Sequence, residues 1–360
     1  MADDAADRYS LTGPERAKAI AAGLAGAEWY HAPIPRAEMK ALMQRSDGPA
    51  LRDTLLWILL LAVSGIVAYE SWGTWWAAPA FAIYGILFAS CGDSRQHECF
   101  HGTAFRTQWM NTVIHQVASF MMLRQARIHR WSHARHHTDT LIVGRDPEIE
   151  VKRPPSLPGI LLDLFYLRDG MRQLRAIFGN ALGRLSADDA DYVPEGERWK
   201  AMLEARIYVA IFAGVALWCI AIGSILPAMF IVFPTFFGAW VDLILFGYTQ
   251  HAGLAENVLD HRLNTRTVYL NPVGRFIYWN MNYHLEHHMF PMVPYHALPR
   301  LHERMKADSP APYPSLWAAW REILPALLRQ ARDPGYFVRR PLQPGARPTP
   351  AMPGLIEIHQ

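Results

Sequence analysis

The apolar residues of this chain are concentrated in four long runs instead of recurring at amphipathic spacing. The runs cover about residues 54–69, 74–91, 205–222 and 225–248. Each approaches the roughly 20 residues needed to cross a 30 Å hydrocarbon layer, and the first is at the short limit. Short turns join them in pairs. The pattern therefore predicts an all-α integral membrane protein with four transmembrane helices in two hairpins.

The charges between the runs predict how the hairpins are oriented. The turns at 70–73 and 223–224 contain no Lys or Arg, whereas the segments before, between and after the hairpins are rich in Arg. Because basic loops remain in the cytoplasm, both termini and the connecting segment are expected there. Trp72, Trp75 and Trp76 lie where an interfacial aromatic belt would be. The alternative interpretation is that the runs are buried helices of a soluble protein.

The runs divide the chain into four parts. Residues 1–53 form a cytoplasmic N-terminal segment without the apolar core and cleavage site of a signal peptide. Residues 54–305 form the membrane domain, residues 306–340 a C-terminal cytoplasmic helix, and the Pro-rich residues 341–360 a disordered tail. Between the hairpins, residues 161–178 alternate apolar side chains with Arg, which indicates an amphipathic helix on the membrane surface or an ordinary packed helix.

Composition excludes some functions. The formal net charge of +3 is small and no basic motif with interleaved aromatic residues occurs, so nucleic acid is not the expected partner. The three cysteines, Cys91, Cys99 and Cys219, are isolated, which fits a reducing compartment and excludes a built-in iron–sulfur cluster. Electrons for any redox reaction must therefore come from another protein.

Three histidine clusters carry the candidate chemistry. They are His97-Glu-Cys-Phe-His101, His133-Ala-Arg-His136-His137 and His284-Leu-Glu-His287-His288. Positions four apart share one face of a helix, so the ends of the first cluster can approach one ion together. In HxxHH the first His lies beside both others, while the adjacent pair diverges by about 100° and can reach two different ions. Two facing HxxHH clusters would supply ligands to both members of a metal pair, and one is expected by chance only about 0.03 times in a chain with this histidine content. All three clusters lie in segments assigned to the cytoplasmic side, where they can converge into a helical cap.

The first cluster also matches HExxH, the helix of zinc proteases, in which Glu98 would be the general base. That interpretation uses only two of the eight clustered histidines, and a zinc protease needs a third ligand and an open water position. Glu98 and Glu286 are better interpreted as carboxylates that orient an imidazole from behind.

At this point the sequence resembles the membrane fatty acid desaturase and hydroxylase superfamily. Its members carry HxxxH, HxxHH and HxxHH boxes beside two membrane hairpins, and the stretches 280–291 (NMNYHLEHHMFP) and 294–299 (PYHALP) are especially specific. The resemblance covers about residues 55–302. It implies a site of two iron ions bound mainly by histidine, a substrate tunnel along the helices, and electrons from a ferredoxin-, rubredoxin- or cytochrome b5-like carrier.

The resemblance also implies the ligands. Gln250-His251-Ala-Gly matches the position of a ninth ligand after the fourth run. The implied set is His97, His101, His133, His136, His137, His251, His284, His287 and His288.

Three other polar residues are candidates beside the site. Asn280 and His129 each lie four residues before the first His of an HxxHH box and could share its face. Asp242, near the cytoplasmic end of the fourth run, could be a supporting carboxylate. The remaining histidines of interest are expected to be structural: His115, His261, His296 and His302.

The function implied by the resemblance is desaturation of a fatty acyl or other lipid-like substrate, with dioxygen as co-substrate. The alternative is hydroxylation by the same kind of site, which includes hydroxylation of a smaller substrate. A zinc metalloprotease and a histidine-rich metal transporter are further alternatives. A transporter places ionisable groups inside its spans, whereas here Asp242 is the main one.

Overall fold

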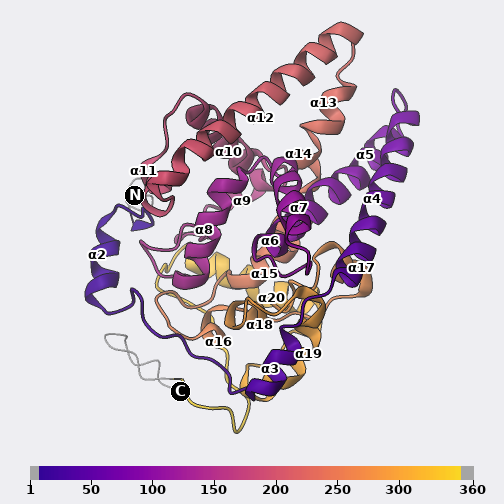
Figure 1. Cartoon of the computed structure of the whole chain (residues 1–360). Coiled ribbons are helices and arrows are strands. Elements are labelled where there is room, and N and C mark those ends of the chain that lie inside the picture. The colour runs from indigo at the N-terminus through magenta and orange to yellow at the C-terminus, as the bar shows by residue number, and fades with distance from the viewer. Residues whose placement is uncertain (1–7, 350–360) are drawn as a thin grey trace.

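Helices make up nearly all the regular structure (Figure 1). The computed structural model describes residues 8–349. Within them, pairing of extended segments is limited to isolated bridges such as Thr267 with Tyr283. The prediction of an all-α chain is confirmed for this part of the protein.

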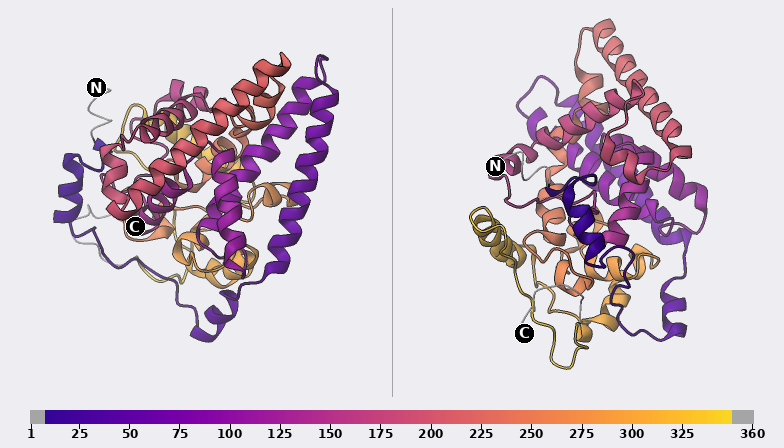
Figure 2. Two further views of the ribbon diagram at one scale, coloured as in Figure 1. Left: turned by 45° about the horizontal axis from the view of Figure 1, so that its top comes forward. Right: turned by 90° about the vertical axis from the view of Figure 1, so that its left-hand side faces the viewer.

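Two long helices, α4 (Asp47–Glu70) and α12 (Glu195–Ile222), project toward one end of the molecule. Helix α5 (Ala77–Gly85) packs beside the first and α13 (Leu226–Ile231) beside the second. Both hairpin tips lie at the same end in two views (Figures 1 and 2). The hairpins therefore point the same way, as a shared membrane would require.

The faces of α4 and α12 are apolar and uncovered. Both helices are long and apolar enough to cross a membrane, and only 22% and 17% of their most apolar windows are buried in the protein. Leu55 and Ile66 on α4 are 63% and 62% exposed, and Leu217 and Ile220 on α12 are 67% and 77% exposed. Water does not tolerate continuous apolar faces of this kind, so lipid is the environment that suits them.

The second and fourth apolar runs are not single regular helices. Helix α5 passes through a π-helix, η1 (Ile86–Ser90), into α6 (Cys91–Phe100). The fourth run is divided into α13, α14 (Pro234–Gly238), a second π-helix η2 (Val241–Gly247), and α15 (Tyr248–His251). Pro234 lacks an N–H and its ring clashes with the preceding turn, which explains the break before α14. The continuous fourth helix expected from the sequence is absent, and the four-span topology stays a prediction.

The two broken helices cross at a pair of glycines. A Cβ atom on Gly238 would lie 1.9 Å from the carbonyl carbon of Gly85, so only hydrogen fits there. Beside the crossing, the Ser90 hydroxyl donates to the Gly238 carbonyl at 2.6 Å and accepts from the Asp242 N–H at 2.9 Å. Each π-helix then leads directly into a helix that carries predicted ligands, so this crossing sets the distance between them.

The remaining helices form a layer below and beside the hairpins, with α10 alongside α12 (Figure 1). They are α2 (Pro14–Ala21), α3 (Arg36–Leu42), α7 (Gln108–Met121), α8 (Ala126–Asp139), α9 (Leu157–Asp163), α10 (Leu167–Ala181), α11 (Ala187–Tyr192), α16 (His261–Asn264), α17 (Pro272–Ile277), α18 (His284–Met289), η3 (Tyr295–Ala297), α19 (Leu298–Met305), η4 (Lys306–Asp308) and α20 (Leu316–Gln330). The amphipathic helix expected at 161–178 is two helices, α9 and α10. The chain bends between them at Tyr166, whose φ is +52°.

The terminal segments lie against this layer. The sequence predicts a C-terminal helix within residues 306–340. In the structure, α20 is the long helix of this segment. Residues 341–349 belong to the predicted disordered tail but contact the body: the Arg347 N–H donates to Asp308 at 2.8 Å, and Arg262 donates to the Arg347 carbonyl at 2.9 Å. The rest of that predicted tail, 350–360, lies outside the described residues.

The glycine crossing predicts the effect of a small substitution. Gly238→Ala forces α14 away from Gly85, and we expect it to destabilise the protein by about 1–3 kcal/mol or to prevent folding. Gly214→Ala in α12 is the matched control, because nothing lies within 4 Å of its Cβ position. Thermal unfolding in detergent measures both variants. Equal stability of the two would contradict the close crossing.

Candidate metal centre

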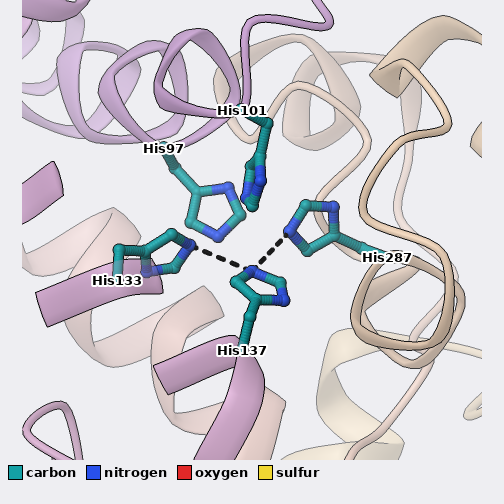
Figure 3. Close-up of side chains that lie close together, drawn as sticks. All are labelled: His97, His101, His133, His137 and His287. Atoms are coloured by element: carbon teal, nitrogen blue, oxygen red, sulfur yellow. Dashed lines mark hydrogen bonds between the residues drawn. The ribbon is translucent and has the colours of Figure 1, made fainter. Parts of the chain in front are cut away.

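Four helices carry the predicted ligands to one place. The first box lies on α6 with His101 at its end, the second on α8, the third on α18, and His251 ends α15. The nine imidazoles form two neighbouring groups. The first holds His97, His101, His133, His137 and His287 (Figure 3), and the second holds His136, His251, His284 and His288; in each group one nitrogen per ring lies within 4.8 Å of the others.

Adjacent histidines belong to different groups. His137 lies in the first group and His136 in the second, and His287 and His288 divide in the same way. The rotation of about 100° between neighbouring helix positions accounts for this division. The two HxxHH boxes therefore each contribute to both groups and hold the two groups side by side.

The spacing of the nitrogens is that of ligands around one ion. In the first group, Nε2 of His137 lies 3.1 Å from Nε2 of His133 and 3.2 Å from Nε2 of His287. In the second, Nε2 of His284 lies 3.0 Å from that of His288 and 3.2 Å from that of His251. Imidazole nitrogens bind a divalent ion at about 2.0–2.1 Å, which places neighbouring ligands about 3.0–3.4 Å apart. The donor set therefore fits one ion in each group.

The opposite ring nitrogen of three histidines is hydrogen-bonded on the side away from the group centre. Nδ1 of His133 bonds to Glu148 at 2.6 Å and that of His136 to Asp146 at 2.9 Å. Nδ1 of His251 donates to the Asn264 carbonyl at 2.8 Å. A proton fixed on Nδ1 leaves the Nε2 lone pair facing the group centre, as metal binding requires.

Thr140 fixes a further ring. Its hydroxyl donates to the His136 carbonyl at 2.7 Å, so toward Nδ1 of His288, 3.2 Å away, it acts as the acceptor. Nδ1 of His288 thus carries the proton and Nε2 faces the second group. Both nitrogens of His97 are buried without a hydrogen-bond partner among the described residues, and a bound ion would satisfy one of them.

Burial keeps most of these imidazoles neutral. It lowers the pKa of His97 to about 4 and holds the pKa of seven others well below the usual value: His101, His133, His137, His251, His284, His287 and His288. His136 is the exception. Burial lowers its pKa as well, but the Asp146 carboxylate outweighs this and raises it to about 9. Neutral imidazole is the form that binds metal, so eight of the nine rings are already in that form at neutral pH.

The two predicted supporting glutamates have other partners. Glu98 accepts from the Thr103 hydroxyl at 2.7 Å and from the Tyr295 N–H at 3.0 Å, and burial raises its pKa to about 8. Glu286 accepts from Thr267 and bonds to Nδ1 of His302, both at 2.6 Å. Among the described residues neither carboxylate bonds to a box histidine, so both connect the boxes to the surrounding loops.

Two of the other three candidates, Asn280 and Asp242, also lie apart from the ligand nitrogens. Helix α18 begins at His284, and Asn280 lies before it in a turn with φ of +59°, so the expected shared helix face is wrong. The Asn280 amide donates to the Tyr295 carbonyl at 3.1 Å. Asp242 lies on η2 with its carboxyl group against that of Asp93.

The third candidate, His129, lies beside a box histidine: one ring nitrogen each of His129 and His133 and a carboxylate oxygen of Glu148 lie within 4.8 Å of one another. Its ring lies 5.2 Å from that of His133 at an interplanar angle of 12°, and its Nδ1 lies 3.2 Å from Nε2 of His115. It packs against a predicted ligand without bonding to its nitrogens.

Sequence reasoning missed the residues that do hold the rings. Asp146, Glu148 and Thr140 lie in loops and turns after the second box, and Asn264 ends the short helix α16, so none lies at helical spacing within a box. The available signal was Asp146-Pro-Glu148, two acids ten to fifteen residues after the histidines they contact.

Comparison with known proteins identifies the family. Residues 70–320 match the model of the fatty acid desaturase family. The chain belongs to that family. It is 24% identical over 311 residues to human fatty acid desaturase 3, covering 75% of this chain and 66% of that protein, just under two thirds of its length. The resemblance noted in the histidine boxes is confirmed. Members of the fatty acid desaturase family are membrane-associated oxidoreductases that generally use iron.

The carboxylate behind His133 gives a test of the metal centre. Removing it in Glu148→Ala frees the ring to rotate, and we expect about 10- to 100-fold weaker metal affinity. Glu195→Ala is the matched control, because Glu195 is exposed at the start of α12 and, among the described residues, bonds to no box histidine. Metal retained against a graded series of chelator concentrations measures the affinity. Identical retention by the two variants would contradict the role of Glu148.

Proposed function

We propose that this desaturase-family protein is a membrane di-iron oxidoreductase that desaturates a fatty acyl or other lipid-like substrate with dioxygen. The observation that carries the proposal is the division of nine imidazoles into adjacent groups of five and four. Imidazole suits iron, zinc and copper alike, so the choice of iron rests on the family. The histidine-rich set differs from the carboxylate-rich sites of soluble di-iron proteins.

Two bound iron ions would supply the redox chemistry, in which reduction of dioxygen is coupled to removal of hydrogen from an unactivated carbon. Two hydrogens leave the substrate, and two electrons and two protons from outside complete the conversion of dioxygen into two waters. The residues of the chain hold and shield this chemistry. Asp146 and Glu148 place negative charge next to the rings of His136 and His133, which would bind the positively charged ions.

The apolar surface supports a membrane location and a lipid-like substrate. An open groove beside α4 and α5 is lined mainly by apolar side chains, including Ile58, Leu61, Tyr84 and Phe230. The hairpin tips lie at the end opposite α18 and its histidines (Figure 1). Together with the basic segments, this supports four spans with both termini and the metal centre on the cytoplasmic side.

The zinc-protease interpretation has less support. It requires the Glu98 carboxylate beside a metal-bound water, whereas Glu98 bonds to Thr103 and to the Tyr295 backbone. A transporter interpretation is disfavoured because the clustered histidines lie on or next to α6, α8, α15 and α18, and neither α4 nor α12 contains a histidine.

Substitution of one ligand from each group tests the proposal. In His287→Ala and His288→Ala we expect iron to fall from two ions per chain to one or fewer and oxygen-dependent product to disappear. His296→Ala, outside both groups, is the control and should keep both. Iron is measured by elemental analysis and product by mass spectrometry with a panel of acyl substrates. A product lighter by two hydrogens supports desaturation, and one heavier by one oxygen supports the hydroxylase alternative. Full activity in either ligand variant would contradict the assignment.

A further inference from the structure

An N-terminal strap, residues 29–44, crosses the outer face of the metal centre. The Trp29 indole donates to the Thr138 carbonyl at 3.0 Å, directly after the second box. The Tyr30 N–H donates to the Leu259 carbonyl at 2.9 Å, and the Ala32 N–H contacts the Met289 sulfur at 3.0 Å. The strap therefore contacts the residues that directly follow both HxxHH boxes, Thr138 and Met289.

Aromatic rings connect the strap with the second histidine group. Trp29 stacks on His261 with ring centroids 4.3 Å apart, and His261 lies 5.1 Å from His288. His31 lies 5.6 Å from Phe290, which is two residues after His288 in the chain. A redox group docked on the strap would thus be separated from predicted ligands by a short series of contacting rings.

The strap forms a basic groove. The groove is lined by Ile34, Arg36, Met39, Lys40, Met43, Gln44 and Phe290. Arg36 and Lys40 are exposed, and neither has an acidic partner in the described part of the chain. Glu38 on the same helix is paired with Arg304 at 3.0 Å. Glu28, just before the strap, is also exposed, so the two unpaired bases Arg36 and Lys40 outnumber this one acid.

The neighbouring helix adds positive charge to the same side. The Glu38–Arg304 pair places α19 beside α3. Arg300 lies four residues before Arg304, on the same face of α19, and is exposed without an acidic partner among the described residues. The groove therefore has an apolar, methionine-rich floor and a basic rim.

The position of the groove favours a soluble protein over lipid as the partner. Helices α3 and α19 lie at the end of the molecule opposite the hairpin tips (Figure 1). If the hairpins are in a membrane, this basic surface faces water at a distance from the lipid. Complementary charge accelerates the encounter of electron-transfer partners, whose interfaces are small, below about 1,200 Å².

We propose that the strap, with Phe290 and Arg300, is the docking surface for a small acidic one-electron carrier protein. The inference rests on the proposed function, because only an oxygen-reducing centre needs two external electrons per turnover. The carrier is oxidised by one electron in each encounter, and two encounters supply one turnover.

Charge reversal on the groove tests the surface. The double variant Arg36→Glu with Lys40→Glu is compared, in nanodiscs, with Arg175→Glu with Arg184→Glu, a pair of exposed bases without acidic partners on and just after α10. Turnover is driven either by reduced plant-type ferredoxin or soluble cytochrome b5, both acidic, or by dithionite with a small uncharged mediator. We expect the groove variant to raise the KM for the better carrier about tenfold and to reduce its salt dependence. Its mediator-driven turnover should equal that of the unaltered protein.

The outcomes separate the docking surface from the proposed function. No mediator-driven product in the unaltered protein would overturn the proposed function itself. Mediator-driven product with an unchanged carrier KM in the groove variant, or with equal effects in both variants, would overturn the docking surface. Failure of both acidic carriers to support turnover, while the mediator does support it, would also overturn the docking surface. An effect that is present with anionic lipids and absent with phosphatidylcholine would assign the groove to lipid and contradict the inference.

Discussion

The arrangement depends on packing nine imidazoles, most of them neutral, into a space where their nitrogens face one another without intervening donors. Buried nitrogens about 3 Å apart, several of which lack a hydrogen-bond partner among the described residues, are unfavourable unless something satisfies them. Two divalent ions would do so. Burial disfavours the protonated form of eight rings, and four Nδ1 contacts fix which nitrogen faces inward. The same features that make the metal-free site unfavourable therefore suit it to bind metal.

The fold supplies this arrangement through broken helices. Two broken helices cross at Gly85 of α5 and Gly238 of α14, and each then passes through a π-helix into a segment that carries histidines of one or the other group. A regular α-helix advances its side chains by a fixed rotation, whereas a π-turn shifts the residues that follow it. The crossing thus sets the distance between the hairpins and aims the first box and His251 toward the boxes on α8 and α18.

Helical periodicity was enough to predict which histidines divide between the groups, because the HxxHH spacing fixes relative directions along one short helix. The chain position of the apolar runs likewise predicted the two long helices. The break at Pro234 has a local cause, but the crossing of the two broken helices depends on the contact between Gly85 and Gly238, more than 150 residues apart, which no local pattern contains. For the same reason Asp146 and Asn264 were missed: their roles arise from a loop that folds back onto α8 and from the end of α16, which lies against α15. Asn280 was misplaced because α18 starts only at His284.

The central claim is that one iron ion lies within each histidine group. Diffraction from crystals of the iron-loaded protein, recorded at the iron absorption edge, locates the ions independently of activity. The account predicts two anomalous peaks, one among His97, His101, His133, His137 and His287 and one among His136, His251, His284 and His288. A single peak, or peaks outside these two groups, would contradict it.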